Sequence, residues 1–481
     1  MKEKIFSLFK PSILMVGIFL LIRIFSFYTY QFPVINSGIG VLLVFIFIFL
    51  CKKNIQLAWI VLIGEILLDG SGHFFEIQGL ILRTWFLGIF GIFWFAHTIK
   101  EKQLRKLFSP FQIRLLCIVA VVFLFATING FLQKHAPMLV IQDMLLYGFV
   151  ALIFPAMEFF QYRDKNYFRM IQGFMYGSAI FSILTFFLYS SGIAYLPDTY
   201  YHWFRNVVGG KITDLGNDFF RIVTSEHLIL VPLFLLFTSF LIHDPKNKKW
   251  WTLLCFTSIP LALNFTRMYF VAIVVGILIL SIKNSFKKWF VVSSMTCLSI
   301  LVFFCAFSFL GSKGNTMGLE QLGLKFAGTK APSTETSGAI RLAILPEALK
   351  TIQKHPWIGS GLGTTVTYID PTTKQSVTRT QFDWGYLEVI AELGIVGTLI
   401  FLFFLAYILF AVAQIGYFKK NHEDRNLIPL SRGLLAGAVS LFIINITTPA
   451  LFQGFGILYF AFIFVFTSKY SQLLPAQSKS K

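Results

Sequence analysis

The feature that most constrains the fold is a series of apolar runs, each about as long as a helix that crosses a bilayer. A window of about twenty residues finds about fourteen such runs along the chain, some short enough to be tilted or broken. Hydrophobic residues make up 56% of the 481 residues and charged residues 13%. A soluble domain of this length does not have that composition. The sequence therefore predicts an all-α polytopic membrane protein with about 12 to 14 transmembrane helices.

The cysteines and the net charge exclude several other classes of protein. Five cysteines lie within apolar runs and lack the close pairing of a metal site or a disulfide framework, so we interpret them as small hydrophobic residues. The formal charge of +19 comes from short basic clusters between apolar runs, a pattern produced by membrane orientation. Nucleic acid is therefore not an expected partner, and no metal or cofactor is expected either.

Basic residues recur in every second connection between the apolar runs. All of these clusters can be cytoplasmic at once if both termini are cytoplasmic. The first apolar run lacks a small-residue cleavage site, so we expect it to be retained as a helix. Residues 1–481 are then one polytopic membrane domain. The clusters are Lys2, Lys4 and Lys10; Lys52 and Lys53; Lys100, Lys102, Arg105 and Lys106; Arg163, Lys165 and Arg169; Lys246, Lys248 and Lys249; Lys283, Lys287 and Lys288; Lys419, Lys420 and Arg425; and Lys479 and Lys481.

Two of the alternate, outward connections are long: residues 190–226 and residues 311–382. Long outward loops on so apolar a protein are suited to a site that handles a polar substrate at the membrane surface. We expect the larger loop to pack on the helices and to carry part of the site. Within it, Ser337 to Lys354 has apolar residues at helical spacing, which predicts an interfacial helix with Arg341 near its start. Pro346 should kink this helix or divide it.

Two further features follow this predicted helix. Gly359, Gly361 and Gly363 alternate in a way that either lets backbone amides approach an anion or forms a plain tight turn. Asp383 directly precedes a long apolar run, where it is either the N-cap of a helix or a catalytic carboxylate. Glu388 and Glu392 lie one turn apart on that helix, and we expect them to pair with arginines.

Three arginines are candidates for binding an anion. Arg221 lies in the first long loop, Arg267 in a tight outward turn, and Arg341 in the predicted interfacial helix. Arginine in such apolar surroundings indicates an anionic partner, and its planar fork suits a phosphate. We expect the three to converge on one outward cavity; alternatively, each side chain only extends to the membrane interface.

These residues resemble a family, the bacterial O-antigen ligase and polymerase superfamily of polytopic enzymes. The resemblance depends on Thr266-Arg267 at the start of an apolar helix, on Arg341 followed by His355-Pro356 and the three alternating glycines, and on Ala391-Glu392-Leu393-Gly394 with Gly397. It covers roughly Arg221 to Gly397 in detail and the rest of the chain by topology.

The resemblance implies a glycosyltransferase of surface polysaccharide assembly in the bacterial inner membrane, facing outward. Its donor would be a glycan on undecaprenyl diphosphate, gripped at the outer leaflet by Arg221, Arg267 and Arg341, and its acceptor another glycan or lipid. Neither a nucleotide sugar nor a metal is required. Membrane lipids are the remaining partner.

The residue that accepts the proton departs from the family pattern. Ligases of the family generally carry a histidine where this chain has Asp383. This difference weakens the prediction of a lipopolysaccharide ligase and leaves polymerisation, or ligation to another acceptor, at least as well supported. His355 and His227 are chemically able to substitute, although a histidine before a proline is more often structural.

A transporter or flippase of lipid-linked oligosaccharide is the alternative from another class. It is suggested by the buried charges Arg23, Glu65, Arg83 and Asp143, of which Glu65 and Arg83 could instead pair between neighbouring spans. The chain shows no internal repeat of the kind expected for a transporter. A purely structural scaffold would leave the outward arginines without a role.

Overall fold

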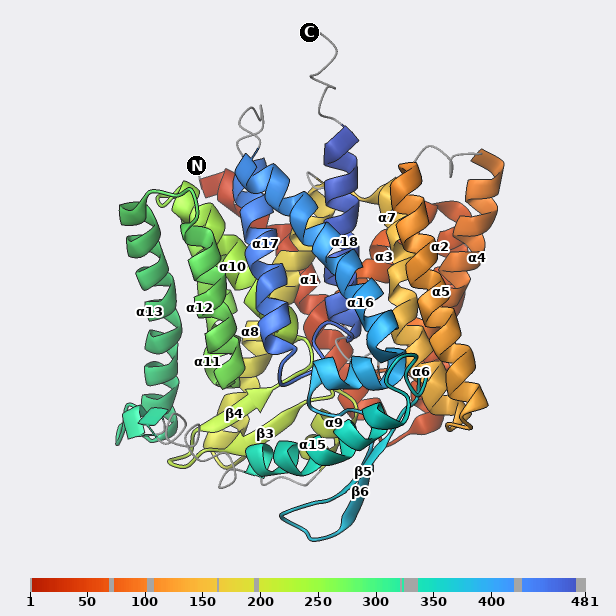
Figure 1. Ribbon diagram of the computed structural model, residues 1–481. Helices are drawn as coiled ribbons and strands as arrows, with labels where there is room; N and C mark the ends of the chain where they lie inside the picture. Colours follow the sequence, from red (N-terminus) through yellow and green to blue (C-terminus); the bar gives the residue numbers. More distant parts are fainter. Residues whose placement is uncertain are drawn as a thin grey trace, which may run out of the picture. The chain divides into compact units, whose positions relative to one another are not determined.

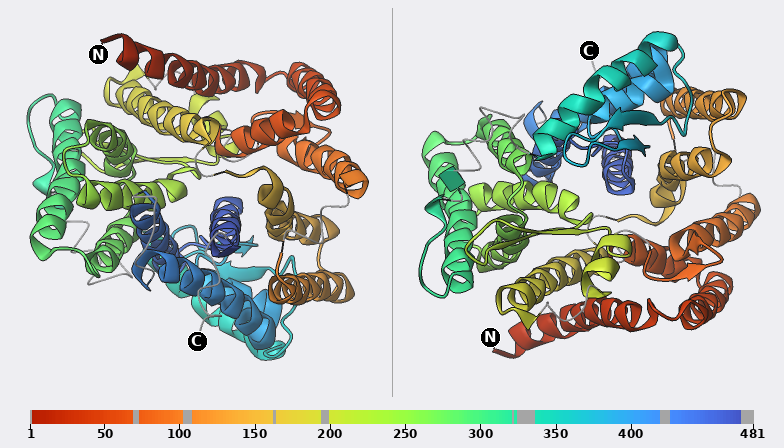
Figure 2. Two further views of the ribbon diagram at one scale, coloured as in Figure 1. Left: turned by 90° about the horizontal axis from the view of Figure 1, so that it is seen from above. Right: turned by 90° about the horizontal axis from the view of Figure 1, so that it is seen from below.

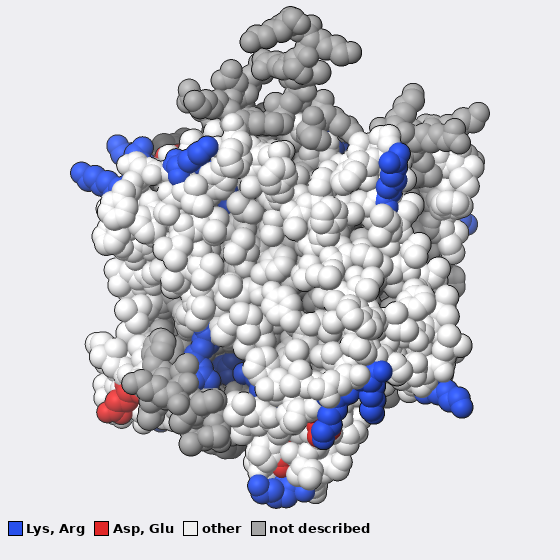
Figure 3. All heavy atoms as spheres, viewed as in Figure 1, with Lys and Arg blue, Asp and Glu red and all other residues white. Residues whose placement is uncertain are grey.

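The structure is a computed structural model (Figure 1). It describes residues 2–68, 73–101, 108–161, 164–193, 199–320, 322–323, 336–418 and 426–472. Within these residues, nine helices are long and apolar enough to cross a membrane, four shorter helices are also apolar, and the strands form three two-stranded hairpins. On the face shown in Figure 3, uncharged side chains cover most of the surface. The predicted all-α polytopic membrane fold is confirmed.

Some residues on which the predictions depend lie outside the described part. They are residues 194–198 of the first long loop, residues 321 and 324–335 of the second, and the basic residues Lys102, Arg105, Lys106, Arg163, Lys419, Lys420, Arg425, Lys479 and Lys481. The side chains of Lys2, Lys4, Lys10 and Lys100 are also outside it.

The chain divides into two compact units. Unit 1 comprises Met1–Leu104, Glu158–Thr266 and Ser285–Gln321, and unit 2 comprises Arg105–Met157, Arg267–Asn284 and Leu322–Lys481. The elements of unit 1 are α1 (Lys2–Thr29), α2 (Pro33–Lys53), α3 (Ile55–Leu68), β1 (Glu76–Ile77), β2 (Leu80–Ile81), α4 (Leu82–Glu101), α8 (Lys165–Ser190), α9 (Thr199–Asn206), β3 (Lys211–Asp214), β4 (Phe220–Val223), α10 (His227–His243), α11 (Lys248–Asn264) and α13 (Phe286–Gly311).

Unit 1 is a helical bundle with a small hairpin at one end. α1 packs along α8, and α11 packs against α8, α10 and α13 (Figure 2). Strands β3 and β4 connect the end of α8 to the start of α10, and β4 also contacts α11. The turn from α10 to α11 contains Lys246 and is followed by Lys248 and Lys249 in the first turn of α11. This lysine cluster is therefore at the opposite end of the bundle from Arg221 in β4. Unit 1 thus separates this lysine cluster from the predicted outward site.

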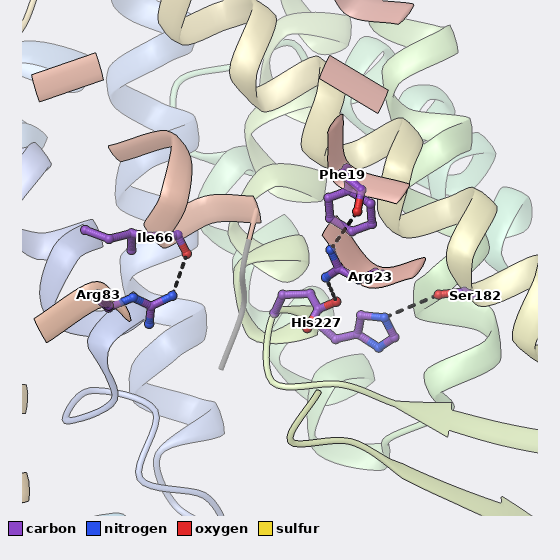
Figure 4. Close-up of polar contacts among 7 residues, drawn as sticks. Phe19, Arg23, Ile66, Arg83, Ser182 and His227 are labelled. Carbon is purple, nitrogen blue, oxygen red and sulfur yellow. Dashed lines mark hydrogen bonds and ion pairs between the residues drawn. The ribbon is translucent and has the colours of Figure 1, made fainter. Parts of the chain in front are cut away.

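A buried ion pair joins the first helix of unit 1 to the start of α10. Arg23 Nη2 lies 2.9 Å from Glu226 Oε1, and both side chains are at most 2% exposed. The Arg23 guanidinium also lies 3.5 Å from the centre of the Phe19 ring, and it donates to the Phe19 carbonyl (Figure 4). A cation surrounded by a carboxylate, a carbonyl and an aromatic face is compensated inside an apolar bundle.

A second buried pair connects α3 to α4. Arg83 Nε lies 3.2 Å from Glu65 Oε2, and Arg83 Nη2 donates to the Ile66 carbonyl (Figure 4). The predicted pairing of Glu65 with Arg83 is confirmed. Charges that suggested a transporter therefore have structural partners within unit 1.

The elements of unit 2 are α5 (Pro110–Leu132), α6 (Pro137–Gly148), the 3₁₀ turn η2 (Phe149–Leu152), α7 (Ile153–Phe159, whose last two residues belong to unit 1), α12 (Arg267–Ser281), α15 (Thr336–Lys354), β5 (Val366–Ile369), β6 (Ser376–Arg379), α16 (Gly385–Ala413), the π-turn η5 (Gln414–Phe418), α17 (Leu427–Ile444) and α18 (Gly454–Gln472). α16 is its central helix, since it contacts α5, α15, α17 and α18.

The described residues 336–382 of the second long loop, called the outward segment below after the orientation predicted for it, pack on one end of α16. α15 and the β5–β6 hairpin lie beside the start of that helix (Figures 1 and 2). Gly385 N donates to the Asn445 carbonyl at the end of α17, which fixes the same end from the other side. The predicted helix around Arg341 is present, but its division at Pro346 is wrong, because α15 continues through this residue as one helix.

Removal of Arg23 tests the packing of unit 1. Arg23→Met should lower the free energy of unfolding by about 3–5 kcal/mol, because it leaves Glu226 buried without its cation. Thermal unfolding in detergent would measure the loss. The double variant Arg23→Met with Glu226→Leu should recover most of it, and Lys248→Met at an exposed position of α11 should change it by less than about 0.5 kcal/mol. A single variant as stable as the parent would contradict this account.

Candidate functional site

The outward segment of unit 2 has a small hydrophobic core of its own. Its buried residues come from α15, from the hairpin and from both sides of the start of α16: Ile344, Ala348, Val366, Tyr368, Phe382 and Ala391. Partly buried residues including Ile340, Trp384 and Leu387 pack against them. This core fixes α15 and the hairpin relative to the first turns of α16, so side chains on all three hold defined positions.

Arg341 and Asp383 are each next in the chain to residues of this small core, Arg341 after Ile340 and Asp383 between Phe382 and Trp384. Trp384 Nε1 donates to the Arg341 carbonyl over 3.0 Å, and Asp383 is the residue before Trp384. Arg341 is half-buried on α15, while the Asp383 side chain is 36% exposed. The structure therefore brings a predicted diphosphate ligand and the predicted catalytic carboxylate into one neighbourhood.

Asp383 is not the N-cap of α16, and that interpretation is wrong. The helix begins at Gly385, its N-cap residue is Trp384, and no side chain caps it. Asp383 has a φ of +55°, in the left-handed region that few non-glycine residues adopt. Glu388 Oε2 instead accepts from the Phe382 amide, which fixes the chain as it enters the helix.

Arg379 is a site residue that the sequence analysis missed. Its Nη1 lies 3.4 Å from Asp383 Oδ2, and its guanidinium lies 5.6 Å from the centre of the Tyr368 ring. Both members of the ion pair are more than a third exposed. The spacing of four residues between Arg379 and Asp383 is the signal that could have indicated this pair. Asp383 is thus an accessible carboxylate with a cationic neighbour.

Glu388 and Glu392 do not have the arginine partners that we expected. Within the described residues, Glu388 accepts from a backbone amide, and Glu392 Oε2 accepts from the Tyr147 hydroxyl at 2.9 Å. The expectation failed because neutral donors from the backbone and from α6 satisfy these carboxyl groups.

Helix α16 is broken at Gly394, and the turn after His355 fills the break. Gly394 has φ +69° and ψ 178°, so two successive helical hydrogen bonds are lost. The freed amides of Ile395 and Val396 donate to the carbonyls of Pro356 and Trp357. In return, the carbonyls of Ala391 and Glu392 accept from the amides of Ser360 and Gly361, at 2.7 and 3.0 Å. The turn replaces the lost bonds with the same number of donors and acceptors.

The glycine turn is therefore a structural insert. Each amide from Gly359 to Gly363 has an acceptor within the protein, the last being Asp143 Oδ2 at 2.8 Å from Gly363 N. The carbonyls of Gly359 and Leu362 accept from Asn129 and His135 on the α5 side. Of the two alternatives for these glycines, the tight turn is confirmed and the anion site is wrong, because its donors are already used.

His355 lies away from Arg341. It directly follows α15, fourteen residues after Arg341, which corresponds to roughly 20 Å along a helix axis. Its carbonyl accepts from the Gly359 amide, so its backbone begins the turn that enters α16. The structure places His355 at the opposite end of α15 from the neighbourhood of Arg341 and Asp383.

In unit 1, Arg221 grips the turn that follows α11. Its Nε donates to the Asn264 carbonyl over 2.7 Å, and its Nη2 donates to Thr266 Oγ1 over 2.8 Å. Arg267 is the next residue in the chain and begins α12 in unit 2. Arg221 thus hydrogen-bonds Thr266, the residue that directly precedes Arg267 in the chain. The predicted convergence of both arginines with Arg341 remains a prediction.

His227 is completely buried at the start of α10. Its Nδ1 lies 2.9 Å from Asn264 Nδ2, and its Nε2 lies 3.5 Å from Ser182 Oγ (Figure 4). An enclosed imidazole of this kind contacts the protein alone. It therefore cannot reach an acceptor hydroxyl from this position.

The comparison with known families identifies one part of the chain. Residues 251–402 match the model of the O-antigen ligase family. This stretch, called the O-antigen ligase segment below, is therefore similar to that family. The match confirms the resemblance to the O-antigen ligase and polymerase superfamily, and it supports a membrane enzyme of glycan assembly of the O-antigen ligase type. No curated protein shows a significant match to the chain.

The matched segment runs from α11 through the broken part of α16. It contains Arg267, Arg341, His355 and Asp383, whereas Arg221 precedes it. Among the described residues, no group of three or more His, Cys, Asp or Glu side chains could hold a metal ion. The candidate side chains in this segment are two arginines, a histidine and a carboxylate.

The insertion of the glycine turn can be tested at Gly361. A Cβ added there would lie 2.2 Å from the Gly130 nitrogen, and the residue has φ +87°. We expect Gly361→Ala to cost more than about 3 kcal/mol of unfolding free energy, from backbone strain together with overpacking. Thermal unfolding would measure it.

Gly79→Ala is the matched control. Gly79 also has a positive φ, +78°, but its added Cβ would meet no atom within 4 Å. It should cost about 1–2 kcal/mol, from strain alone. Equal losses for the two variants would show that the turn does not sit tightly against α5.

Proposed function

We propose that this protein transfers a glycan from undecaprenyl diphosphate to an acceptor hydroxyl at the outer leaflet of the bacterial inner membrane, as a ligase or a polymerase. The observation that carries the proposal is the placement of Arg341 and Asp383 on one small core inside the O-antigen ligase segment. Such a transfer requires two groups from the protein, an arginine that stabilises the leaving diphosphate and an accessible carboxylate that accepts a proton.

The reaction needs charge stabilisation on one side of the sugar and proton removal on the other. The acceptor oxygen attacks the anomeric carbon and forms the new C–O bond, while the bond from that carbon to the lipid diphosphate breaks. The diphosphate leaves with the electron pair, and its added charge is stabilised by arginine. The proton of the attacking hydroxyl passes to a carboxylate oxygen of Asp383.

Arg221, Arg267 and Arg341 are proposed to bind the diphosphate. Each charge-assisted hydrogen bond to a phosphate oxygen would contribute roughly 1.5–3 kcal/mol. Arg221 has its guanidinium held by Asn264 and Thr266, and Arg267 follows in the chain, so these two start close together. A diphosphate has several oxygens, so more than one planar guanidinium can hydrogen-bond it at the same time.

Asp383 is the preferred base, and His355 is the second candidate. Asp383 is near Arg341 and more than a third exposed, whereas His355 lies at the other end of α15. Arg379, whose Nη1 lies 3.4 Å from Asp383 Oδ2, restrains the direction of this carboxylate. A carboxylate can accept a proton from a hydroxyl that becomes acidic as the new bond forms.

The remaining features of the proposal concern the membrane. We place both termini in the cytoplasm and the site on the outer side, with lipids around the helices, because the basic clusters then all face inward. The rival, a transporter of the same lipid-linked glycan, loses support because Arg23, Glu65 and Arg83 are engaged in buried pairs within unit 1.

Incubation of the purified protein with an undecaprenyl-diphosphate oligosaccharide in liposomes tests the proposal. Chain growth or transfer to an acceptor, together with release of undecaprenyl diphosphate, is the expected result. Movement of the intact donor across the liposome with no release of lipid diphosphate would establish the transporter instead.

The role of Asp383 can be tested by a single substitution. Asp383→Asn should lower kcat by about 10²–10⁴-fold with little change in donor KM, because it removes the proton acceptor and leaves the arginines in place. Transfer rates at saturating donor would measure this. Asp370→Asn is the control, since Asp370 lies in the β5–β6 hairpin that precedes Asp383 and accepts from the amides of Thr372 and Thr373. If His355→Gln, and not Asp383→Asn, caused the loss, the assignment of the base would be wrong.

A further inference from the structure

The turn between α11 and α12 has an unusual backbone. Phe265 has φ +46° and ψ 41°, a left-handed conformation that costs a residue with a Cβ roughly 1–2 kcal/mol. Its ring is stacked on Phe304 of α13, with centroids 4.5 Å apart and ring planes at 16°. Phe219 packs edge-on against it at 6.4 Å. Aromatic packing within unit 1 therefore holds this residue in a conformation that it would otherwise leave.

The conformation of Phe265 determines where its two neighbours point. The Asn264 carbonyl on one side and the Thr266 hydroxyl on the other both accept from Arg221, through Nε and Nη2. These two donors lie on one edge of the guanidinium plane. Two hydrogen bonds along one edge fix the plane of the fork as well as its position.

The hydrogen bonds behind this contact have a defined direction. The Thr266 hydroxyl donates to Asn264 Oδ1, so its proton is committed and a lone pair remains for Arg221. Asn264 Nδ2 donates in turn to His227 Nδ1, which places the His227 proton on Nε2, toward Ser182. Asn264 and His227 are both fully buried, so water cannot replace either partner.

We infer that the turn Asn264–Phe265–Thr266 is a positioning element that sets the plane of the Arg221 guanidinium for the donor diphosphate. The inference rests on the proposed function, in which Arg221 binds that diphosphate. It assigns a task to Thr266, to the buried Asn264 and to the packed ring of Phe265. Since Arg267 directly follows Thr266, the same turn also sets where the backbone of the second arginine begins.

Positioning matters here because an arginine side chain has many rotamers. Binding an anion with a free arginine loses that rotamer freedom, whereas a fork that is already held loses less. A preorganised donor is also worth more to a leaving group than one that must reorient during the reaction. Thr266 is therefore expected to affect donor binding although it need not touch the donor.

The test measures binding of undecaprenyl diphosphate to the full-length protein in lipid nanodiscs, together with donor KM and kcat for transfer. Thr266→Val removes the hydroxyl at nearly constant volume and should weaken binding and raise KM about tenfold, with kcat changed less. Thr266→Ser keeps the hydroxyl and should restore both values. Thr257→Val is the matched control, because Thr257 is buried in α11, the helix that leads into the turn, and its hydroxyl donates to the Leu253 carbonyl.

Arg221→Gln, measured in parallel, separates the inference from the proposed function. If Arg221→Gln weakens binding while Thr266→Val behaves like the parent protein, the inference is overturned and the diphosphate role stands. If Arg221→Gln itself binds like the parent, the diphosphate role of Arg221 fails, and the inference fails with it. Loss of binding in Thr266→Ser as great as in Thr266→Val would also overturn the inference, because the hydroxyl would then not be the group that matters. Should Thr266→Val not fold, Thr266→Ala is measured in its place with the same expectations.

Discussion

The arrangement of the candidate site depends on how α16 satisfies its backbone where the helix is broken. Unpaired amides and carbonyls are costly in an apolar surrounding, so a break in a membrane helix needs replacement partners. At Gly394 the turn from Pro356 to Gly361 supplies two acceptors and two donors for the four groups that the break leaves open. This exchange attaches the outward segment to a transmembrane helix by hydrogen bonds between backbone groups.

Several features of unit 2 follow from that attachment. α15 ends directly before the turn, so its far end is fixed by the break, and its face is fixed by the small core over the start of α16. Arg341 lies on α15 and Asp383 lies just before α16, and the hydrogen bond from Trp384 Nε1 to the Arg341 carbonyl joins the two elements. Unit 1 uses a related solution, in which a strained turn held by aromatic packing positions Arg221. In both units a polar side chain of the proposed site is carried by backbone that the protein has already ordered.

The sequence predicted well those features that depend on local periodicity. The lengths of the apolar runs indicated an all-α membrane protein, and the helical spacing after Ser337 indicated α15 with Arg341 near its start. The alternation of glycines indicated a tight turn as one of two alternatives. The pairing of Glu65 with Arg83 could be expected, because neighbouring spans of a helical hairpin face each other.

Features that depend on distant partners could not be predicted in the same way. The glycine turn pairs with residues about thirty positions later, and nothing in the spacing of Gly359, Gly361 and Gly363 indicates whether their amides meet an anion or a broken helix. Glu392 finds a tyrosine 245 residues away instead of an arginine. A helix cap was one of the two alternatives for Asp383, because this residue precedes an apolar run, but its positive φ turns the chain before the helix begins.

The central claim is that the outward segment is fixed to α16 by backbone hydrogen bonds at the break, and amide hydrogen exchange tests it most directly. In the protein in nanodiscs, the amides of Ser360, Gly361, Ile395 and Val396 should exchange as slowly as those in the middle of the transmembrane helices, because each donates to a carbonyl inside the protein. Exchange of these four amides within seconds, at the rate of an exposed loop, would contradict the account, since the turn would then not occupy the break.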